Sequence, residues 1–381
     1  SCDVSQIDDG EVAETAERAI AERPHALPAL DIDTVGAGGG SIAWRDGGGA
    51  LRVGPQSAGA VPGPACYGGG GELATVTDAN LLLGRLPEDS PLAGGLRLDR
   101  AAAERAVGEL AQALAIDVRA CAEGIVRVAE SEMLGALRLI TVERGIDPRG
   151  FALMPFGGAG PLHACAMARE LDISRVLCPR ASGVLCALGL AAAAPRHDLS
   201  RTVLLRGEQL SEQRLHEVRE ALVTEADEAL AGRRERLRVS YELRYGGQSF
   251  ELAVEQSESV DPGALRERFA AAHEQRYGYR EDDANVELVN VRVSVWAAAP
   301  ELAVGAEHGD AFAPGTPLAG PSVCALGDST LFLPDGWSGE VDEHGTFVLE
   351  DRREHERDGE HEREHEREHE RDGAAARDEQ R

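Results

Sequence analysis

Hydrophobic and polar positions follow two different periods along the chain, and the change of period divides it into two parts. In the first part apolar residues recur every three or four positions over residues 98–115 and 117–143, which predicts two amphipathic helices, the first with Asp99 as its N-cap. The apolar run 152–156 has the length of a buried strand. Helices that alternate with buried strands predict a layered α/β domain to about residue 200.

In the second part, apolar and polar residues alternate with a period of two. Residues 237–245 and 250–254 flank a Gly-Gly pair and predict a β-hairpin, and residues 286–297 predict a long, half-buried antiparallel strand. Helices are expected over residues 210–230 and 261–276, with short strands at 322–326, 330–333 and 346–349. These elements predict a smaller, β-rich α+β domain.

The stretch after the first buried strand has the character of a ligand-binding turn. Gly157, Gly158 and Gly160 leave the backbone bare, and Pro161 opens a helix expected over residues 162–171. Bare backbone between a strand and a helix lets a flat or anionic ligand approach closely. Alternatively, the glycines only allow the helix to pack tightly on the strand.

A dinucleotide fingerprint is the other candidate for this turn, and the spacing does not support it. The place of the third glycine holds His163, and in the glycine run 36–41 the same place holds Ser41. A hydride-transfer enzyme is therefore not indicated. The segment 182–193 is rich in small residues and is expected to form a helix that packs closely on its neighbours.

Residues 36–71 are unusually rich in glycine. We interpret them as ordered loops that carry function, because Ala60, Val61, Ala65, Cys66 and Tyr67 favour burial. The alternative is a flexible insertion, since glycine-rich segments often are just that.

The net charge of the chain indicates which classes of binding partner are disfavoured. The net charge is −28, and all 39 basic residues are arginine. An acidic surface repels nucleic acid and anionic lipid, and no run of residues is long and apolar enough to predict a membrane span. Acidity without lysine suggests a protein from a high-salt cytoplasm, whose stability falls when salt is removed.

The seven cysteines include no CxxC pair, and their apolar surroundings predict reduced core residues in the cytoplasm. A reactive thiol at Cys66 is the alternative. The last residues, 351–381, repeat the letters EHER and predict a solvated, disordered tail. Their histidines, His355, His361, His365 and His369, leave only an adventitious metal affinity as the alternative.

Several strings taken together resemble the hydantoinase A / 5-oxoprolinase family, the ATP-dependent enzymes that open or carboxylate small carbonyl compounds. The resemblance covers about residues 1–350 and is carried by SCDV, DIDTVGAGGGSIAW, GPQSAGAVPGPACYGGGG, TVTDAN, VERGIDPRGFALMPFGGAGPLHA, ASGVLCALGL, RYGGQSFEL, HEQRYGY, VELVNVRV and GPSVCALGDSTLFLPDGW. By this resemblance the chain corresponds to the C-terminal part of the family's full-length chain.

The resemblance implies an α/β fold. It consists of one lobe of an actin-like (RNase H-like) ATPase over residues 1–205, a β-rich domain over 206–350 and the tail over 351–381. The family's N-terminal lobe, with its first phosphate loop, is expected to be supplied separately. The chain begins inside the second phosphate loop and keeps Ser1 and Asp3 of it.

The resemblance also implies the site, with ATP and Mg²⁺ as cofactors. Asp3 is expected to face the phosphates or their magnesium, as a catalytic and metal-binding residue. Asp78 is the second expected catalytic residue. The residues expected to bind the nucleotide or its phosphates are Gly157, Gly158, Ala159, Gly160, Ser1, Gly38, Gly39, Gly40 and Ser41. Asp33 stands where relatives often carry histidine.

The implied reaction is ATP-driven hydrolysis of a cyclic amide such as 5-oxoproline or a hydantoin. An ATP-dependent ketone carboxylase subunit and an inactive scaffold subunit are the alternatives. The implied partners are the missing N-terminal ATPase lobe, a hydantoinase B-like subunit and further copies in an oligomer.

Overall fold

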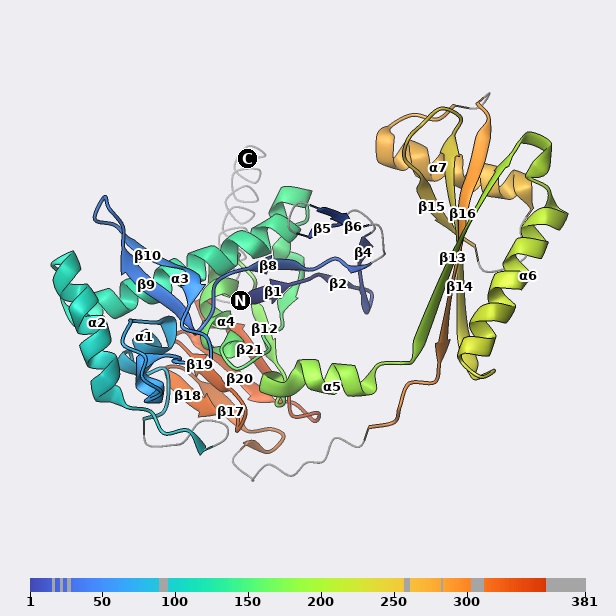
Figure 1. Cartoon of the computed structure of the whole chain (residues 1–381). Helices are drawn as coiled ribbons and strands as arrows, with labels where there is room; N and C mark the ends of the chain where they lie inside the picture. The colour runs from blue at the N-terminus through green and yellow to red at the C-terminus, as the bar shows by residue number, and fades with distance from the viewer. Residues whose placement is uncertain are drawn as a thin grey trace, which may run out of the picture. The chain divides into compact units, whose positions relative to one another are not determined.

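The structure is a computed structural model that describes residues 1–15, 18–20, 23–25, 29–88, 95–256, 261–281, 284–302 and 312–353. Within these residues the fold is mixed α/β, as expected, and the chain divides into two compact units (Figure 1). The first unit contains Ser1–Cys186 and the segment from Ala306 onward, and the second contains Ala187–Gly305. The repeated tail and its four histidines lie outside the described residues.

This division differs from the expected boundary at residues 205 and 206, because the last strands return to the first unit. Strand β21 (Phe347–Asp351) pairs antiparallel with β12 (Arg175–Cys178), which in turn runs parallel to β11 (Ala152–Leu153). The five-stranded sheet has the order β11-β12-β21-β20-β17, with β20 at Trp337–Val341 and β17 at Pro317–Ala319. Main-chain pairing thus joins segments that are far apart in the sequence, since Arg175 stands opposite Glu350.

The helices predicted over residues 98–115, 117–143 and 162–171 are present in the first unit, and α1 adds one that was not predicted. The helices of this unit are α1 (Val76–Leu82), α2 (Arg100–Leu114), α3 (Val118–Ile140) and α4 (Gly160–Glu170), and α5 (Leu185–Ala192) continues from its last residues into the second unit. The expected N-cap is confirmed, since Asp99 accepts a hydrogen bond from the Ala102 amide at 3.0 Å.

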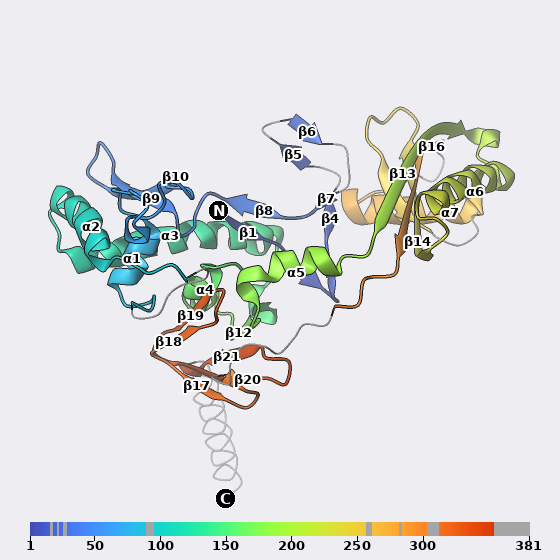
Figure 2. The same cartoon turned by 60° about the horizontal axis from the view of Figure 1, so that its bottom comes forward.

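Helix α4 lies at the centre of the first unit. It packs on α3 and also on β12 and on β19 (Thr330–Leu333), which forms a hairpin with β18 (Ser322–Ala325) (Figure 2). Its buried Ala164 and Ala168 share one apolar core with Ile125 of α3 and Phe347 of β21. The turn that precedes α4 is therefore held from several sides.

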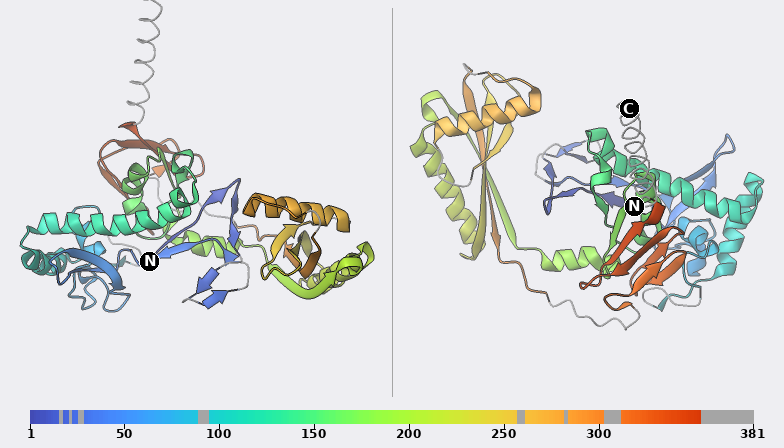
Figure 3. Two further views of the ribbon diagram at one scale, coloured as in Figure 1. Left: turned by 90° about the horizontal axis from the view of Figure 1, so that it is seen from above. Right: turned by 180° about the vertical axis from the view of Figure 1, so that it is seen from behind.

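The N-terminal segment and the glycine-rich region are also folded. Strand β1 (Cys2–Val4) pairs with β8 (Asp33–Val35), and the strands β9 (Ser41–Arg45) and β10 (Leu51–Ser57) form a hairpin that lies along α3 (Figure 3). The remaining short strands of this part are β2 (Ile7–Asp8), β3 (Glu11–Val12), β4 (Glu14–Thr15), β5 (Arg18–Ile20), β6 (Arg23–His25) and β7 (Ala29–Leu30).

The interpretation of residues 36–71 as ordered loops is confirmed, although not every apolar residue there is buried. Ala65 and Cys66 are in the core, in a short 3₁₀ helix (Ala65–Tyr67), whereas Ala60 and Val61 are exposed. The expected close packing of segment 182–193 was wrong. A 3₁₀ turn (Ser182–Val184) leads there into α5, which has no buried residue and leaves Leu190 80% exposed.

The second unit is an antiparallel four-stranded sheet with two helices. Its strand order is β13-β16-β14-β15, with bounds Arg196–Arg206, Val286–Ala297, Arg234–Tyr245 and Leu252–Glu255. The expected hairpin and long strand are confirmed. The helices are α6 (Glu212–Ala229) and α7 (Pro262–Tyr277).

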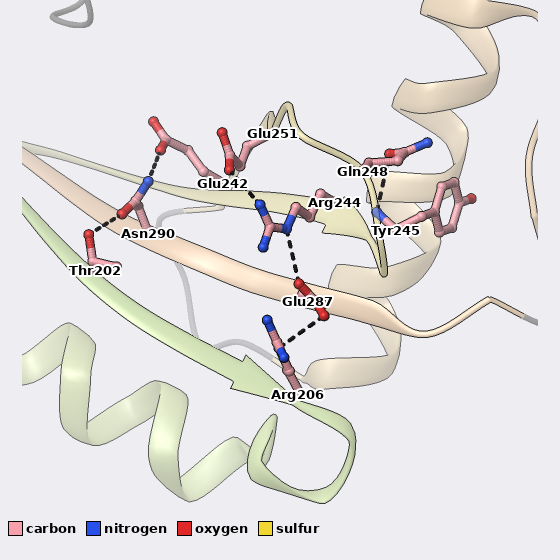
Figure 4. Close-up of polar contacts among 9 residues, drawn as sticks. All are labelled: Thr202, Arg206, Glu242, Arg244, Tyr245, Gln248, Glu251, Glu287 and Asn290. Carbon is pink, nitrogen blue, oxygen red and sulfur yellow. Dashed lines mark hydrogen bonds and ion pairs between the residues drawn. The ribbon is translucent and has the colours of Figure 1, made fainter.

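One face of this sheet is apolar and the other is ionic. Val239, Tyr241 and Leu243 of β14 pack with the buried residues of α6 and α7. The residues between them on the strand point to the opposite face, since side chains alternate along a strand. There, Glu287 accepts from Arg244 at 3.0 Å and pairs with Arg206 at 2.9 Å, and Asn290 donates to Glu242 at 2.6 Å (Figure 4).

Candidate functional site

The turn between β11 and α4 presents bare backbone, as predicted. Gly157 has φ +77°, a conformation that favours glycine, and its amide donates to the carbonyl oxygen of Ser182 at 2.7 Å. A Cβ atom added at Gly157 or Gly158 would meet nothing within 4 Å. Helix α4 then begins at Gly160, with Ala159 at its N-cap position and no side chain that caps it. The positive end of the helix is therefore left to face the space beside the turn.

The loop of residues 36–40 lies directly against this turn. A Cβ atom at Gly39 would be 3.8 Å from the Cβ of Ala159 and only 2.8 Å from the Thr77 hydroxyl oxygen. The Gly39 carbonyl oxygen accepts hydrogen bonds from the Thr77 amide at 2.8 Å and from its hydroxyl at 2.9 Å. Glycine at position 39 is thus required by close approach, and the approach joins two segments that are distant in sequence.

Ser41 holds the same loop from inside. Its Oγ atom accepts from the Gly38 amide at 3.0 Å and donates to the Gly36 carbonyl oxygen at 3.3 Å, and the side chain is buried. The hydroxyl is therefore engaged with its own loop. Its bonds fix the conformation of the loop, and a direct contact of Ser41 with the nucleotide stays a prediction.

Two pockets of the first unit meet at this turn. The larger, about 650 Å³, is called the glycine pocket here; its lining includes Gly39, Gly40, Gly158, Ala159 and Asp328. The smaller, about 270 Å³, is called the histidine pocket; its lining includes Ser1, Asp3, Gly38, Gly157, Ala159, Gly160 and His163. Ala159 lines both pockets. All predicted site residues except Asp78 and Ser41 therefore lie on these walls, and their roles in binding stay predictions.

Asp3 reaches the histidine pocket from strand β1. Its Oδ1 atom accepts a hydrogen bond from the Thr34 hydroxyl at 2.7 Å, across the pairing of β1 with β8. The side chain is exposed, which suits a ligand that comes from solution. Among the described residues no three histidine, cysteine or acidic side chains gather around a point where a metal ion could bind. Asp3 alone supplies too few ligands for a metal ion. It suits Mg²⁺ that is bound together with a nucleotide, because such an ion is usually held by one or two carboxylates and by the phosphates.

Asp78 lies outside both pockets and has a structural environment. It is fully buried at the start of α1, where it forms a capping box with Thr75. Its carboxylate oxygens accept from the Cys66 amide at 2.8 Å and the Thr75 hydroxyl at 2.7 Å, and also from the amides of Thr75 and Ala65. These bonds use the carboxylate to close the loop of residues 65–78. We therefore leave Asp78 out of the site, although it was expected to be catalytic.

Cys66 is not placed for nucleophilic chemistry. The side chain is completely buried, and burial together with the nearby Asp78 carboxylate raises the pKa of its thiol far above the ordinary value. A thiol of this kind stays protonated at neutral pH, and the thiolate is the reactive form. The alternative of a reactive Cys66 is therefore not supported.

Two residues of this region were not predicted from the sequence: His163, which lines the histidine pocket, and Glu130, which contacts His163 from behind. His163, in the first turn of α4, is fully buried, and its Nδ1 atom lies 3.0 Å from Glu130 Oε1 on α3. Glu130 in turn pairs with Arg85 at 3.2 Å. The letters PLHA contain His163, but no sequence spacing connects it with Glu130, which stands 33 residues earlier on another helix.

Comparison with known proteins agrees with these motifs. The sequence profile of the hydantoinase/oxoprolinase family matches residues 1–199. This chain belongs to that family. Caprolactamase subunit alpha of Pseudomonas jessenii is 37% identical over 85% of this chain, and 5-oxoprolinase 1 of Arabidopsis thaliana is 36% identical over 77%. The chain spans 53% of the first relative's length and 25% of the second's, so it corresponds to only part of each.

Two solved structures share the fold of this family member. The crystal structure of the ATP-dependent caprolactamase from Pseudomonas jessenii covers 89% of this chain with a TM-score of 0.68 and 34% identity, and the chain covers 55% of it. Nucleotide-free acetone carboxylase covers 92% with a TM-score of 0.77, but at 24% identity it indicates the fold alone. Within the part of the chain that the structure describes, every helix is too short or too polar to span a bilayer.

Proposed function

We propose that this chain is part of an enzyme that uses ATP to hydrolyse a cyclic amide, and that it forms one lobe of an actin-like ATPase fold. The observation that carries the proposal is the meeting of two glycine-rich segments and Asp3 around two pockets that share Ala159. Two adjoining pockets suit a reaction with two substrates, a nucleotide and a small carbonyl compound. Two relatives carry the names caprolactamase and 5-oxoprolinase, and both names denote enzymes that act on cyclic amides.

The chemistry explains why two substrates have to meet. Resonance makes an amide carbonyl a poor electrophile. Transfer of the γ-phosphoryl group from ATP to the amide oxygen releases ADP and leaves a carbon that water can attack. The C–N bond then breaks to give an amine and an acyl phosphate, and a second water converts the acyl phosphate to carboxylate and inorganic phosphate.

In this proposal the residues of the chain bind the nucleotide and the cyclic amide and orient them toward each other. The bare backbone at Gly158 and the uncapped start of α4 are suited to anionic oxygens. The amides of Gly39 and Gly40 are suited to charge that develops on the amide oxygen or on the phosphate, whereas the Gly38 amide is engaged by Ser41. Mg²⁺, when bound, would be held by Asp3 and by the phosphates and would neutralise phosphate charge.

The finer assignments also belong to the proposal. The ring of the substrate, whether a 5-oxoproline, a hydantoin or a larger lactam, is set by pocket shape. Carboxylation of a ketone is the alternative reaction, and no feature of the pocket walls favours it. The partners we propose are the part of the relatives that this chain does not cover, which brings the first phosphate loop, and a hydantoinase B-like second subunit.

A titration tests the proposal. ATP with Mg²⁺ is added to this chain alone and to this chain co-purified with the remaining region of the caprolactamase subunit, and heat of binding is recorded. We expect binding only when both parts are present, together with ADP release that rises on addition of ε-caprolactam or 5-oxoproline. Tight binding by the single chain contradicts the need for the second part. Failure to bind ATP in either form contradicts the proposed function and favours the scaffold subunit.

A further inference from the structure

The histidine pocket contains a polar atom that the protein itself does not satisfy. The Nε2 atom of His163 is buried and has no hydrogen-bond partner among the residues that the structure describes, and His163 is one of the residues that line the pocket. The ring is 1% exposed. Buried polar groups without a partner cost free energy, so one that lines a pocket points to a ligand that completes it.

The neighbouring charges determine which kind of hydrogen bond is missing. Glu130 forms an ion pair with Arg85 at 3.2 Å, and a carboxylate in an ion pair only accepts hydrogen bonds. The Nδ1 atom of His163, 3.0 Å from Glu130, must therefore carry the proton. In a neutral ring Nε2 is then an acceptor. A ligand that meets the neutral ring at Nε2 therefore has to supply a donor.

The walls of the pocket indicate what surrounds that donor. Apart from Asp3, Ser1 and the glycine backbone, the lining is largely apolar, with Met133, Leu137, Leu153, Met154, Phe156 and Met167. The volume of about 270 Å³ lies just below the range of ~300–1,000 Å³ in which whole small ligands bind. Such a pocket suits a single ring system.

We propose that His163 is a specificity-determining binding residue whose Nε2 atom accepts a hydrogen bond from an N–H group on a ring that enters the histidine pocket, and that Glu130 positions it. The inference rests on the proposed function, which offers two rings of this chemistry. One is the adenine of ATP, through its exocyclic amine. The other is the cyclic amide, through its ring N–H.

Paired ligands that differ only at the donor distinguish the two sources. ATP is compared with purine riboside triphosphate, which has hydrogen in place of the exocyclic amine, and ε-caprolactam with N-methylcaprolactam, which lacks the N–H. Dissociation constants are measured by calorimetry on the two-part protein described above. We expect one pair to differ by about 5- to 20-fold in the wild type, and His163→Ala to reduce that ratio to about 1.

Three further variants separate binding from folding. His163→Gln, whose side-chain oxygen can accept, is expected to restore part of the preference. Glu130→Gln can donate to Nδ1 and move the ring proton to Nε2, so the preference is expected to fall or to reverse. His216→Ala, at an exposed position of the second unit, is the control and leaves both ratios unchanged.

Each outcome has one meaning. Loss of the nucleotide preference in His163→Ala assigns adenine to the pocket, and loss of the lactam preference assigns the cyclic amide. Wild-type binding without any preference, or a preference that His163→Ala and Glu130→Gln leave intact, overturns this inference but not the proposed function. If the wild type binds neither nucleotide nor lactam, the proposed function fails and this inference fails with it.

Discussion

The pocket walls of the first unit and the ionic sheet face of the second use polar groups in opposite ways. On the sheet face, Arg244, Glu287 and Arg206 satisfy one another, and so do Glu242 and Asn290 (Figure 4). At the histidine pocket, Nε2 of His163 has no hydrogen-bond partner, and the start of α4 no capping side chain, within the described part of the chain. A region whose charges are paired within the protein stabilises a fold, whereas a region that leaves donors and acceptors open is prepared for a ligand.

The largest effect is expected for the buried carboxylate of Asp78, which is paired within the protein although it belongs to the first unit. The substitution Asp78→Ala removes the fully buried carboxylate that accepts hydrogen bonds from the Cys66 and Thr75 amides. We expect a loss of about 3–5 kcal/mol in the free energy of unfolding. Guanidinium denaturation measures the loss, and hydrogen exchange of the α1 amides assigns it to the first unit. A variant that keeps its stability but loses activity would instead return Asp78 to the catalytic residues.

The next effect concerns binding and leaves stability nearly unchanged. A Cβ atom at Gly158 meets no neighbouring atom within 4 Å, and Gly158 lines the glycine pocket. We therefore expect Gly158→Val to weaken ATP or lactam binding by about 30-fold or more, equivalent to about 2 kcal/mol. Gly150→Val, at another position where a Cβ meets nothing, is the matched control. Equal affinity of Gly158→Val and the control would show that no ligand occupies the glycine pocket.

The smallest effect tests the ionic face of the second unit. In Glu242→Gln the side chain keeps its shape but loses the charge that pairs with Arg292, in a place where both side chains are mostly buried (13% and 22% exposed). We expect the unfolding free energy to fall by about 1–2 kcal/mol, with no change in ligand affinity.

The control for this variant is Glu217→Gln on α6, because Glu217 pairs with Arg214 at 3.0 Å where both side chains are about half exposed. An exposed pair contributes about 0–1 kcal/mol, so little change is expected. Hydrogen exchange of the β16 amides checks both variants. A loss of ligand affinity in Glu242→Gln alone would mean that the second unit takes part in binding.

Local chemistry in the sequence was sufficient to predict the elements. The period of apolar residues located α2, α3, α6 and β16, and Asp99 marked a helix start through its side-chain oxygen. The bare turn at Gly157–Gly160 was also predicted, because only glycine combines a positive φ with an open approach. The same local reasoning was wrong for the segment 182–193, since small apolar residues fit both a buried helix and the exposed α5.

The sequence by itself thus determined which segments are helices, strands and bare turns, and through its motifs the family. Only the tertiary structure decided that strands near residue 350 complete the first unit's sheet, that Asp78 is engaged with backbone amides, and that Glu130 stands behind His163. The physical reason is the sequence separation over which the deciding interactions act. Helix periods and caps arise from residues a few positions apart, whereas a strand's partner or the charge beside a histidine depends on contacts between segments that the chain brings together only when it folds.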